Sequence, residues 1–239
     1  YQINLAIAGI AVGTVSLPIL ATAIKNKNFL KIYNIQNKSI ELSLLLSIPA
    51  SLGLILASEE IVNSLFGYGS FSEQNIYMSA QALKYFGFGV PAFALIKVLS
   101  NFFFARDNTK TPLYLSIFIV VLNVSISLLF FKKIGFIIIP IATSISTWAG
   151  IVGYIILLNK SKFLMIKNYL FKNIFKIILS AVFMSLILYF GLNYFKEDLE
   201  YTNEFKSIYL LFIVGFVATI YLISCYLLGV LKIKNYKTN

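Results

Sequence analysis

Apolar runs of about 20 residues recur along the whole chain, and short polar segments separate them. A run of that length is what an α-helix needs to cross the hydrocarbon core of a bilayer. The pattern predicts seven membrane-spanning helices, with an interfacial extension of the second toward Phe66. Their expected bounds are Gln2–Ile24, Ser39–Ala57, Ser79–Phe104, Thr111–Phe131, Phe136–Leu158, Lys172–Tyr194 and Ser207–Leu231.

The spacing of these runs divides the chain into three parts. Residues 1–158 are expected to form a five-helix bundle, residues 159–171 a basic linker, and residues 172–239 a pair of additional helices. The chain is 59% hydrophobic, whereas soluble domains are about 45–50% apolar. The fold class is therefore an all-α polytopic membrane protein. Because the chain does not begin with Met and starts inside a predicted helix, we expect further helices upstream.

The basic residues are distributed unevenly between the two sides of this predicted topology. One side holds 14 of the 20 Lys and Arg residues, whereas the other holds four and most of the acidic residues. The positive-inside rule makes the lysine-rich side, and with it the C-terminus, cytoplasmic. The net charge of +11 is explained by these loops, so no nucleic-acid partner is expected. The 14 residues are Lys25, Lys27, Lys31, Lys38, Arg106, Lys110, Lys160, Lys162, Lys167, Lys172, Lys176, Lys232, Lys234 and Lys237.

Four prolines fall within the predicted helices, at Pro18, Pro49, Pro91 and Pro140. A proline inside a helix removes one backbone hydrogen bond and kinks the helix. Membrane helices tolerate such breaks where neighbouring helices or a cavity satisfy the freed groups. The kinks could be static, but their recurrence favours helices that bend between two states, as in transporters.

The third predicted helix carries a lysine within its apolar sequence. Lys97 lies about seven residues from the cytoplasmic end, or roughly 10 Å along the helix axis. It shares a helix face with Asn101, so the two residues indicate a polar stripe lining a cavity. The alternative is that Lys97 snorkels to the interface. The loop that follows, "ARDNTKTP", is a tight turn whose Arg106 could also attract a phosphate group.

A second polar group lies on the fourth and fifth predicted helices. Asn123 and Ser127 are spaced to share a face, and Thr143 belongs to a hydroxyl cluster that continues to Thr147. Small hydroxyl residues usually serve close helix packing. A cation or substrate site is the other interpretation.

Several kinds of chemistry have no candidate residues in this sequence. It contains no histidine, and its single cysteine, Cys225, cannot form an internal disulfide. We find no pair of carboxylates within a span, no CxxC and no phosphate-binding loop. We therefore expect a transporter without cofactor, metal or catalytic residues. An intramembrane enzyme acting on polyprenyl lipids and a purely structural lobe are the other classes considered.

Three stretches of the sequence resemble a known family. "VPAFALIKVLSNFFFARDNTKTPL", "AGIAVGTVSLPIL" and "SIPASLGLILASEEIVNSLFGYGSF" are similar to segments of the MurJ (MviN) family of lipid II flippases. These flippases belong to the multidrug/oligosaccharidyl-lipid/polysaccharide exporter superfamily. The resemblance covers residues 1 to about 158, and the last two helices match only in position and apolar character.

The resemblance implies a fold and an activity. The family has fourteen helices in two lobes, so the seven helices here would be helices 8–14, the C-terminal lobe of a MATE-like exporter fold. It implies that the protein flips lipid II, an undecaprenyl-pyrophosphate-linked muropeptide, to the outer leaflet of the bacterial inner membrane by alternating access. The expected partners are lipid II, membrane lipids and the N-terminal lobe of the same chain. The nearest alternative is a related exporter of another polyprenyl-linked oligosaccharide or a drug.

The resemblance also assigns roles to individual positions. Gln2 stands where some family members carry a glutamate in the cavity. Asn123 and Thr143 match a sodium-binding pattern, whereas Ser127 stands where sodium-binding members have a carboxylate. The last two helices would hold the lipid tail in a groove. Lys97, Asn101 and Arg106 are the other candidate substrate-binding residues.

Overall fold

The computed structural model describes residues 6–69 and 71–231, and these residues form helices joined by short loops, with no strand. A π-helical turn, η1 (Ala6–Ala11), leads into the first α-helix, and two 3-10 turns, η2 (Gly135–Ile137) and η3 (Glu197–Leu199), lie farther along the chain. The α-helices are α2 (Val12–Lys25), α3 (Phe29–Leu56), α4 (Ser58–Phe66), α5 (Glu73–Phe104), α6 (Lys110–Ile134), α7 (Ile138–Lys160), α8 (Asn168–Tyr194) and α9 (Lys206–Leu227).

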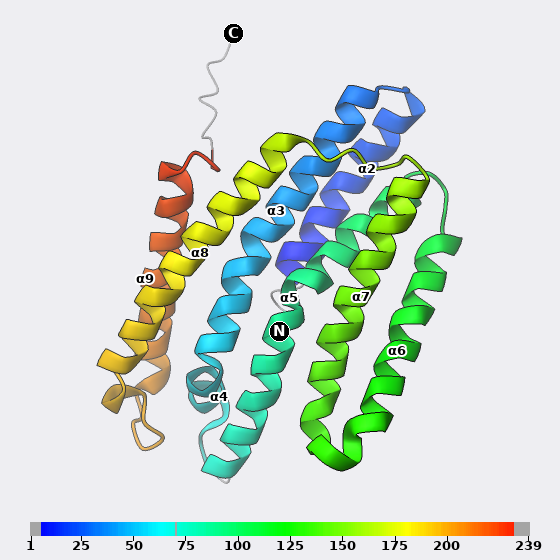
Figure 1. Cartoon of the computed structure of the whole chain (residues 1–239). Helices are drawn as coiled ribbons and strands as arrows, with labels where there is room; N and C mark the ends of the chain where they lie inside the picture. Colours follow the sequence, from blue (N-terminus) through cyan, green and yellow to red (C-terminus); the bar gives the residue numbers. More distant parts are fainter. Residues whose placement is uncertain (1–5, 70, 232–239) are drawn as a thin grey trace.

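Within the described residues, six segments are long and apolar enough to cross a membrane. One of them, Lys110–Lys160, folds back on itself through η2 and so contains both α6 and α7. The bundle therefore has the seven long helices predicted from the apolar runs, with α4 as the short extension after α3 (Figure 1). The expected all-α membrane fold is confirmed.

The two helices whose starts differ most from the apolar pattern are α3 and α5, and both begin earlier than predicted. α3 starts at Phe29 rather than Ser39, because the Asn28 side chain accepts a hydrogen bond from the Lys31 amide and caps the helix. In the same way the Ser72 hydroxyl caps α5, which starts at Glu73 rather than Ser79. Polar residues are frequent in residues 29–38 of α3, and the first turn of α5 is polar, so hydropathy alone places both starts too late.

Helices α3 and α5 lie at the centre of the bundle, and the other helices pack around them (Figure 1). One apolar cluster joins α2, α3, α5 and α7 around Phe102, Phe103 and Tyr154. A second cluster joins α8 and α9 to α3. Helix α6 packs along α7, where a Cβ on Gly150 would collide with Ile119. The last two helices are thus attached to the other five mainly through α3.

The carbonyls freed by two of the prolines receive side-chain hydrogen bonds from other helices. Pro49 cannot donate to Leu45, and the Tyr221 hydroxyl of α9 donates to that carbonyl at 2.7 Å. Pro91 cannot donate to Gly87, and the Ser51 hydroxyl of α3 donates to it at 2.7 Å. Helix α5 changes direction midway along its length in Figure 1. These contacts meet the requirement that backbone groups in an apolar medium be satisfied.

The other two prolines differ in their positions. Pro18 lies inside α2, as predicted. The sequence predicts a helix that starts at Phe136 and contains Pro140. In the structure α7 begins at Ile138, so Pro140 lies in its first turn. A proline at that position removes no intrahelical hydrogen bond, because the first amides of a helix have no partner. Pro140 therefore starts a helix and does not kink one.

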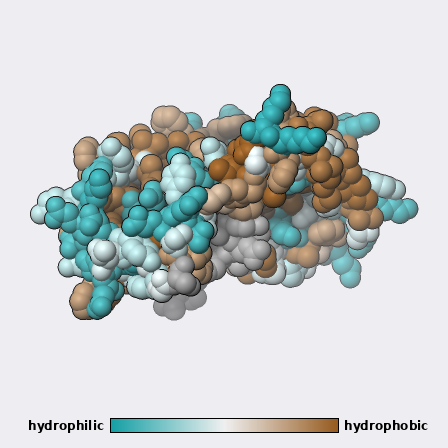
Figure 2. Space-filling model, turned by 90° about the horizontal axis from the view of Figure 1, so that it is seen from below, coloured by the Kyte–Doolittle hydropathy of each residue, from teal (hydrophilic) through white to brown (hydrophobic). Residues whose placement is uncertain are grey.

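The loops with most of the lysines and those with most of the carboxylates lie at opposite ends of the bundle. The basic end holds residues 26–28, 105–109 and 161–167, at the top of Figure 1, and the acidic end holds residues 57–69 and 195–205. Seen from the acidic end, hydrophilic side chains gather on the side of α4, α8 and α9 (Figure 2). The structure thus reproduces the alternation of loops inferred from the basic residues.

Candidate functional site

Two cavities meet at Lys97. One, of about 410 Å³, is lined by α2, α5, α6 and α7 and includes Gly13, Asn101, Ser116 and Tyr154. The other, of about 510 Å³, lies between α5, α6 and α7. Lys97 and Ser116 line both cavities. The Lys97 side chain is exposed, so its charge is available to a ligand entering between these helices.

Asn101 ties α5 to α2 beside Lys97. Its side-chain amide donates to the Gly13 carbonyl at 2.7 Å. A Cβ on Gly13 would lie 2.9 Å from the Asn101 amide nitrogen, so a side chain at this position would displace the Asn101 amide. Asn101 therefore positions the wall of the cavity as well as lining it.

Asn123, Ser127 and Thr143 form one hydrogen-bonded chain. The Asn123 amide donates to the Thr143 hydroxyl at 2.8 Å, and the Ser127 hydroxyl approaches the Asn123 side-chain oxygen at 3.5 Å. Thr143 in turn donates to the carbonyl of Ile139 at 2.7 Å. The sequence pattern thus identified three residues that meet. Their bonds to one another join α6 to α7, which supports the packing interpretation, and the cation role stays a prediction.

Arg106 lies at the basic end, away from the two cavities that Lys97 lines. Its guanidinium donates to the carbonyls of Phe102 and Phe163 at 2.6 and 3.3 Å and lies 4.3 Å from the centre of the Phe163 ring. Burial lowers the pKa of Arg106, and the charge of Tyr33 acts in the opposite direction. Its contacts fix the end of α5 to the loop between α7 and α8, and its proposed role in substrate binding stays a prediction.

The expected basic linker is held against the bundle. Gln36 donates to the Phe163 carbonyl at 2.9 Å, and Asn37 donates to Met165 at 2.7 Å. The Asn37 side-chain oxygen accepts from the Lys167 amide. These buried polar residues of α3 were missed by the sequence interpretation. Gln2, the remaining candidate for substrate binding, lies outside the described residues.

An apolar groove lies between α3, α8 and α9. It has a volume of about 370 Å³ and is lined by residues that include Pro49, Gly53, Met184, Val217 and Ala218. Nothing lies within 4 Å of a Cβ built on Gly53, so the groove is open at that position. An aliphatic chain is the kind of ligand that such a surface accepts.

The family model described as "Lipid II flippase MurJ" matches residues 1–231. The chain belongs to this family. A probable lipid II flippase MurJ of Rickettsia prowazekii is 36% identical over 148 residues, which are 62% of this chain and 29% of that protein. The corresponding protein of Buchnera aphidicola subsp. Baizongia pistaciae is 27% identical over 235 residues, 97% of this chain and 46% of its own length. The chain thus spans less than half the length of these relatives.

A solved structure extends the likeness to the fold. The structure titled "Lipid II flippase MurJ, inward closed conformation" superimposes with a TM-score of 0.76 at 24% identity. The match covers 95% of this chain and 44% of that chain. Over 95% of this chain, the arrangement of helices described above is therefore the fold of that structure.

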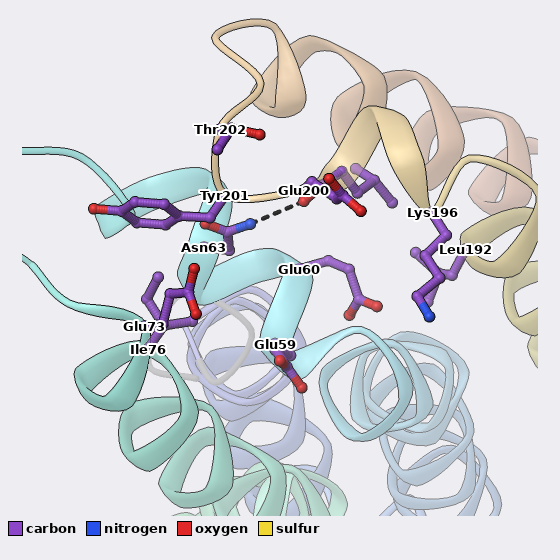
Figure 3. Close-up of a pocket in the computed structure, with 11 residues that line it drawn as sticks. Glu59, Glu60, Asn63, Glu73, Ile76, Leu192, Lys196, Glu200, Tyr201 and Thr202 are labelled. Atoms are coloured by element: carbon purple, nitrogen blue, oxygen red, sulfur yellow. Dashed lines mark hydrogen bonds between the residues drawn. The ribbon is translucent and has the colours of Figure 1, made fainter.

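The acidic end of this MurJ family member contains a further cavity, of about 530 Å³ (Figure 3). Glu59 and Glu60 reach it from α4, Glu73 from the start of α5, and Glu200 from the loop before α9. The pKa of Glu60 is raised, mainly by burial and to a smaller extent by the charge of Glu59. A backbone hydrogen bond acts in the opposite direction. The charge pattern of the sequence predicts these acids on one side of the membrane, but it does not predict that they meet in one cavity.

Lys206 is another residue that the sequence did not single out. It is fully buried, and its ammonium donates to the carbonyls of Gly67 and Tyr201 at 2.7 and 2.8 Å. The nitrogen also lies 4.3 and 4.8 Å from the ring centres of Tyr68 and Tyr201. These contacts fix the start of α9 to the glycine–aromatic turn after α4. The aromatic residues around Gly67 were the available signal, because they can hold a cation.

Proposed function

We propose that the chain is the C-terminal lobe of a flippase that moves lipid II from the cytoplasmic to the outer leaflet of the bacterial cell membrane. The observation that carries this proposal is the MurJ family match over residues 1–231, on a chain whose interior cavities meet at a lysine. Such a protein contributes to peptidoglycan synthesis by delivering the lipid-linked precursor.

The Lys97 cavity supplies what a pyrophosphate needs in order to cross a bilayer. An unpaired charge loses its hydration in an apolar medium, at a large cost in free energy. Lys97 forms no ion pair among the described residues, where the one such pair joins Lys38 and Glu41. Its ammonium can therefore replace part of the water around the pyrophosphate.

Alternating access requires helices that bend, and α5 has the features of such a helix. Pro91 interrupts its backbone hydrogen bonds, and donors from α3 and α7 bond to carbonyls of the same region, at Tyr85, Gly87 and Phe88. Exchange of these side-chain bonds would let the two halves of α5 change their angle. No covalent bond is made or broken in flipping, so the protein acts as a transporter and not as an enzyme.

The apolar groove between α3, α8 and α9 is the proposed site for the lipid tail. Its lining is predominantly aliphatic, and Val214 and Leu222 of that lining are exposed. The basic end would face the cytoplasm, because Lys and Arg are enriched in cytoplasmic loops. The N-terminal lobe of the full-length protein would close the Lys97 cavity from the other side.

The experiment is complementation of a bacterium depleted of its own lipid II flippase with the full-length protein, together with lipid II translocation by the purified protein in vesicles. We expect growth and restored cell shape, and transfer of lipid II between leaflets. The proposal would be contradicted if the protein inserts correctly but the bacterium does not grow and lipid II stays on one leaflet of the vesicles. Transport of another polyprenyl-linked oligosaccharide but not lipid II would assign it to the alternative substrate class.

A further inference from the structure

The hydroxyl of Tyr154 is buried without a hydrogen-bond partner. Tyr154 of α7 is among the largest fully buried side chains, and its oxygen bonds to nothing among the described residues. Ser116 of α6 lies near enough to interact with this hydroxyl, but no hydrogen bond of standard geometry joins the two side chains. A buried hydroxyl that lacks a partner lowers stability, so native proteins rarely leave one unless it has another role.

Tyr154 and Ser116 both lie in the wall of the Lys97 cavity. They also lie at the same depth as Lys97. Lys97 is seven residues before the end of α5, Ser116 six residues after the start of α6, and Tyr154 six residues before the end of α7. At the rise of an α-helix, each is roughly 10 Å from the basic end. Three helices thus bring one cation and two hydroxyls to one level.

The packing of the helices keeps this level open. Helix α6 packs along α7 and only lightly against α5, so the space between Lys97 and Ser116 is not filled by a helix contact. Asn101 is already bonded to the Gly13 carbonyl. The hydroxyls of Tyr154 and Ser116 are therefore the donors beside Lys97 that remain available to a ligand.

We propose that Tyr154 and Ser116 are binding residues for the pyrophosphate group, donating their hydroxyl protons to phosphate oxygens while Lys97 supplies the positive charge. The inference rests on the proposed function, and it names the donors that complete that site. Hydrogen bonds to ionised oxygens are about twice as strong as neutral ones. The Tyr154 hydroxyl, which has no hydrogen-bond partner among the described residues, would gain one from a bound phosphate oxygen.

A binding role and a structural role for Tyr154 predict opposite results for the change Tyr154→Phe. The variant keeps the ring, whose centre lies 6.1 Å from that of Phe103, and removes only the hydroxyl. Because that hydroxyl has no partner, its loss should leave the thermal midpoint unchanged or raise it. Tyr221→Phe is the matched control, since its hydroxyl donates to the Leu45 carbonyl and its loss should lower the midpoint.

The test uses the purified full-length protein and measures three quantities for each variant. These are the thermal midpoint, the affinity for undecaprenyl pyrophosphate, and the initial rate of lipid II translocation in vesicles. We expect Tyr154→Phe to weaken pyrophosphate binding about tenfold and to slow translocation by a similar factor. Ser116→Ala should act in the same direction and keeps the inference testable if Tyr154→Phe does not fold.

The outcomes separate this inference from the proposed function. Wild-type affinity and wild-type translocation in both variants would overturn the inference and leave the proposed function intact. Weaker binding that only accompanies a lowered thermal midpoint would assign Tyr154 to the packing of the core and would also overturn it. A wild-type protein that binds undecaprenyl pyrophosphate but does not move lipid II would contradict the proposed function, while the binding comparison would still decide the role of the hydroxyls.

Discussion

At the scale of single residues, the position of Lys97 combines a charge with access to two cavities. Its neighbours on α5 are the buried residues Val98 and Leu99, whereas Lys97 itself is exposed. The sequence predicted a polar stripe with Asn101, and the structure places both residues on the same cavity. A role of Lys97 in substrate binding is therefore tested by measuring transport, because an exposed lysine contributes little to folding.

We expect Lys97→Ala in the full-length protein to insert normally and to lose part of its lipid II translocation. The variant removes the charge that would offset the pyrophosphate in the cavity. Translocation in vesicles and the amount of protein in the membrane are the two measurements. Lys133→Ala, at the far end of α6, is the control and should keep full activity. Normal translocation by Lys97→Ala would leave snorkelling as the role of this lysine.

Glu60 should give the acidic cavity a measurable dependence on pH. Because burial raises its pKa in the folded protein, the neutral form is favoured by folding, and stability is lost as pH rises through that pKa. Glu60→Gln should therefore raise the thermal midpoint at pH 7. The difference from wild type should shrink at about pH 4, where the carboxyl is largely protonated in the unfolded chain as well.

The measurement is thermal unfolding of the purified protein at the two pH values. Glu204→Gln is a suitable control, because Glu204 is exposed and does not line the cavity. An equal or lower midpoint for Glu60→Gln at neutral pH would show that burial does not dominate the behaviour of this carboxyl.

At the scale of elements, the proline positions of α3 and α5 depend on other helices. Each freed carbonyl bonds to a hydroxyl that is distant in the sequence, Leu45 to Tyr221 and Gly87 to Ser51. The sequence could locate the missing amide but not the donor that replaces it. The donor is determined by which residues face the carbonyl once the helices pack.

We expect Ser51→Ala to destabilise the protein by about 1 to 3 kcal/mol, because it leaves the buried Gly87 carbonyl without its donor. In a Pro91→Ala background the restored backbone amide can bond to that carbonyl, so Ser51→Ala should cost less there. Chemical unfolding of the two single variants and the double variant measures the coupling. Additive effects would mean that the hydroxyl does not compensate for Pro91.

At the scale of the whole molecule, α8 and α9 complete a groove that neither could form alone. We expect Gly53→Leu to fill part of this groove, since Gly53 lines it and a Cβ at that position meets no other atom within 4 Å. Binding of a long polyprenyl pyrophosphate should weaken several-fold, while binding of a short-chain analogue should change little, because only the tail would reach the groove.

Gly215→Leu is the matched control for this prediction. Gly215 of α9 also has open space around its Cβ, but it is not among the residues that line the groove. Equal weakening by both variants, or none by Gly53→Leu, would mean that the lipid tail binds elsewhere.

The sequence by itself determined the fold class, the number of long helices and the alternation of successive loops between the two ends of the bundle. Apolar length and loop charge are local properties, and a bilayer imposes both on a chain without reference to its tertiary contacts. The sequence also paired Asn123 with Ser127, because residues four apart share a helix face. The starts of α3 and α5 were missed because the first segments of these helices, residues 29–38 and 73–78, contain several polar residues.

Only the tertiary structure decided which polar residues meet across helices. Tyr154 looks like an ordinary core aromatic in the sequence, and its unpartnered hydroxyl becomes visible only when α6 and α7 are placed beside α5. The contacts of Lys206 with the rings of Tyr68 and Tyr201 are likewise visible only in the tertiary structure. Contacts between helices depend on how each helix is rotated about its axis and on the angle at which two helices cross. The spacing of residues along one helix determines neither of these quantities.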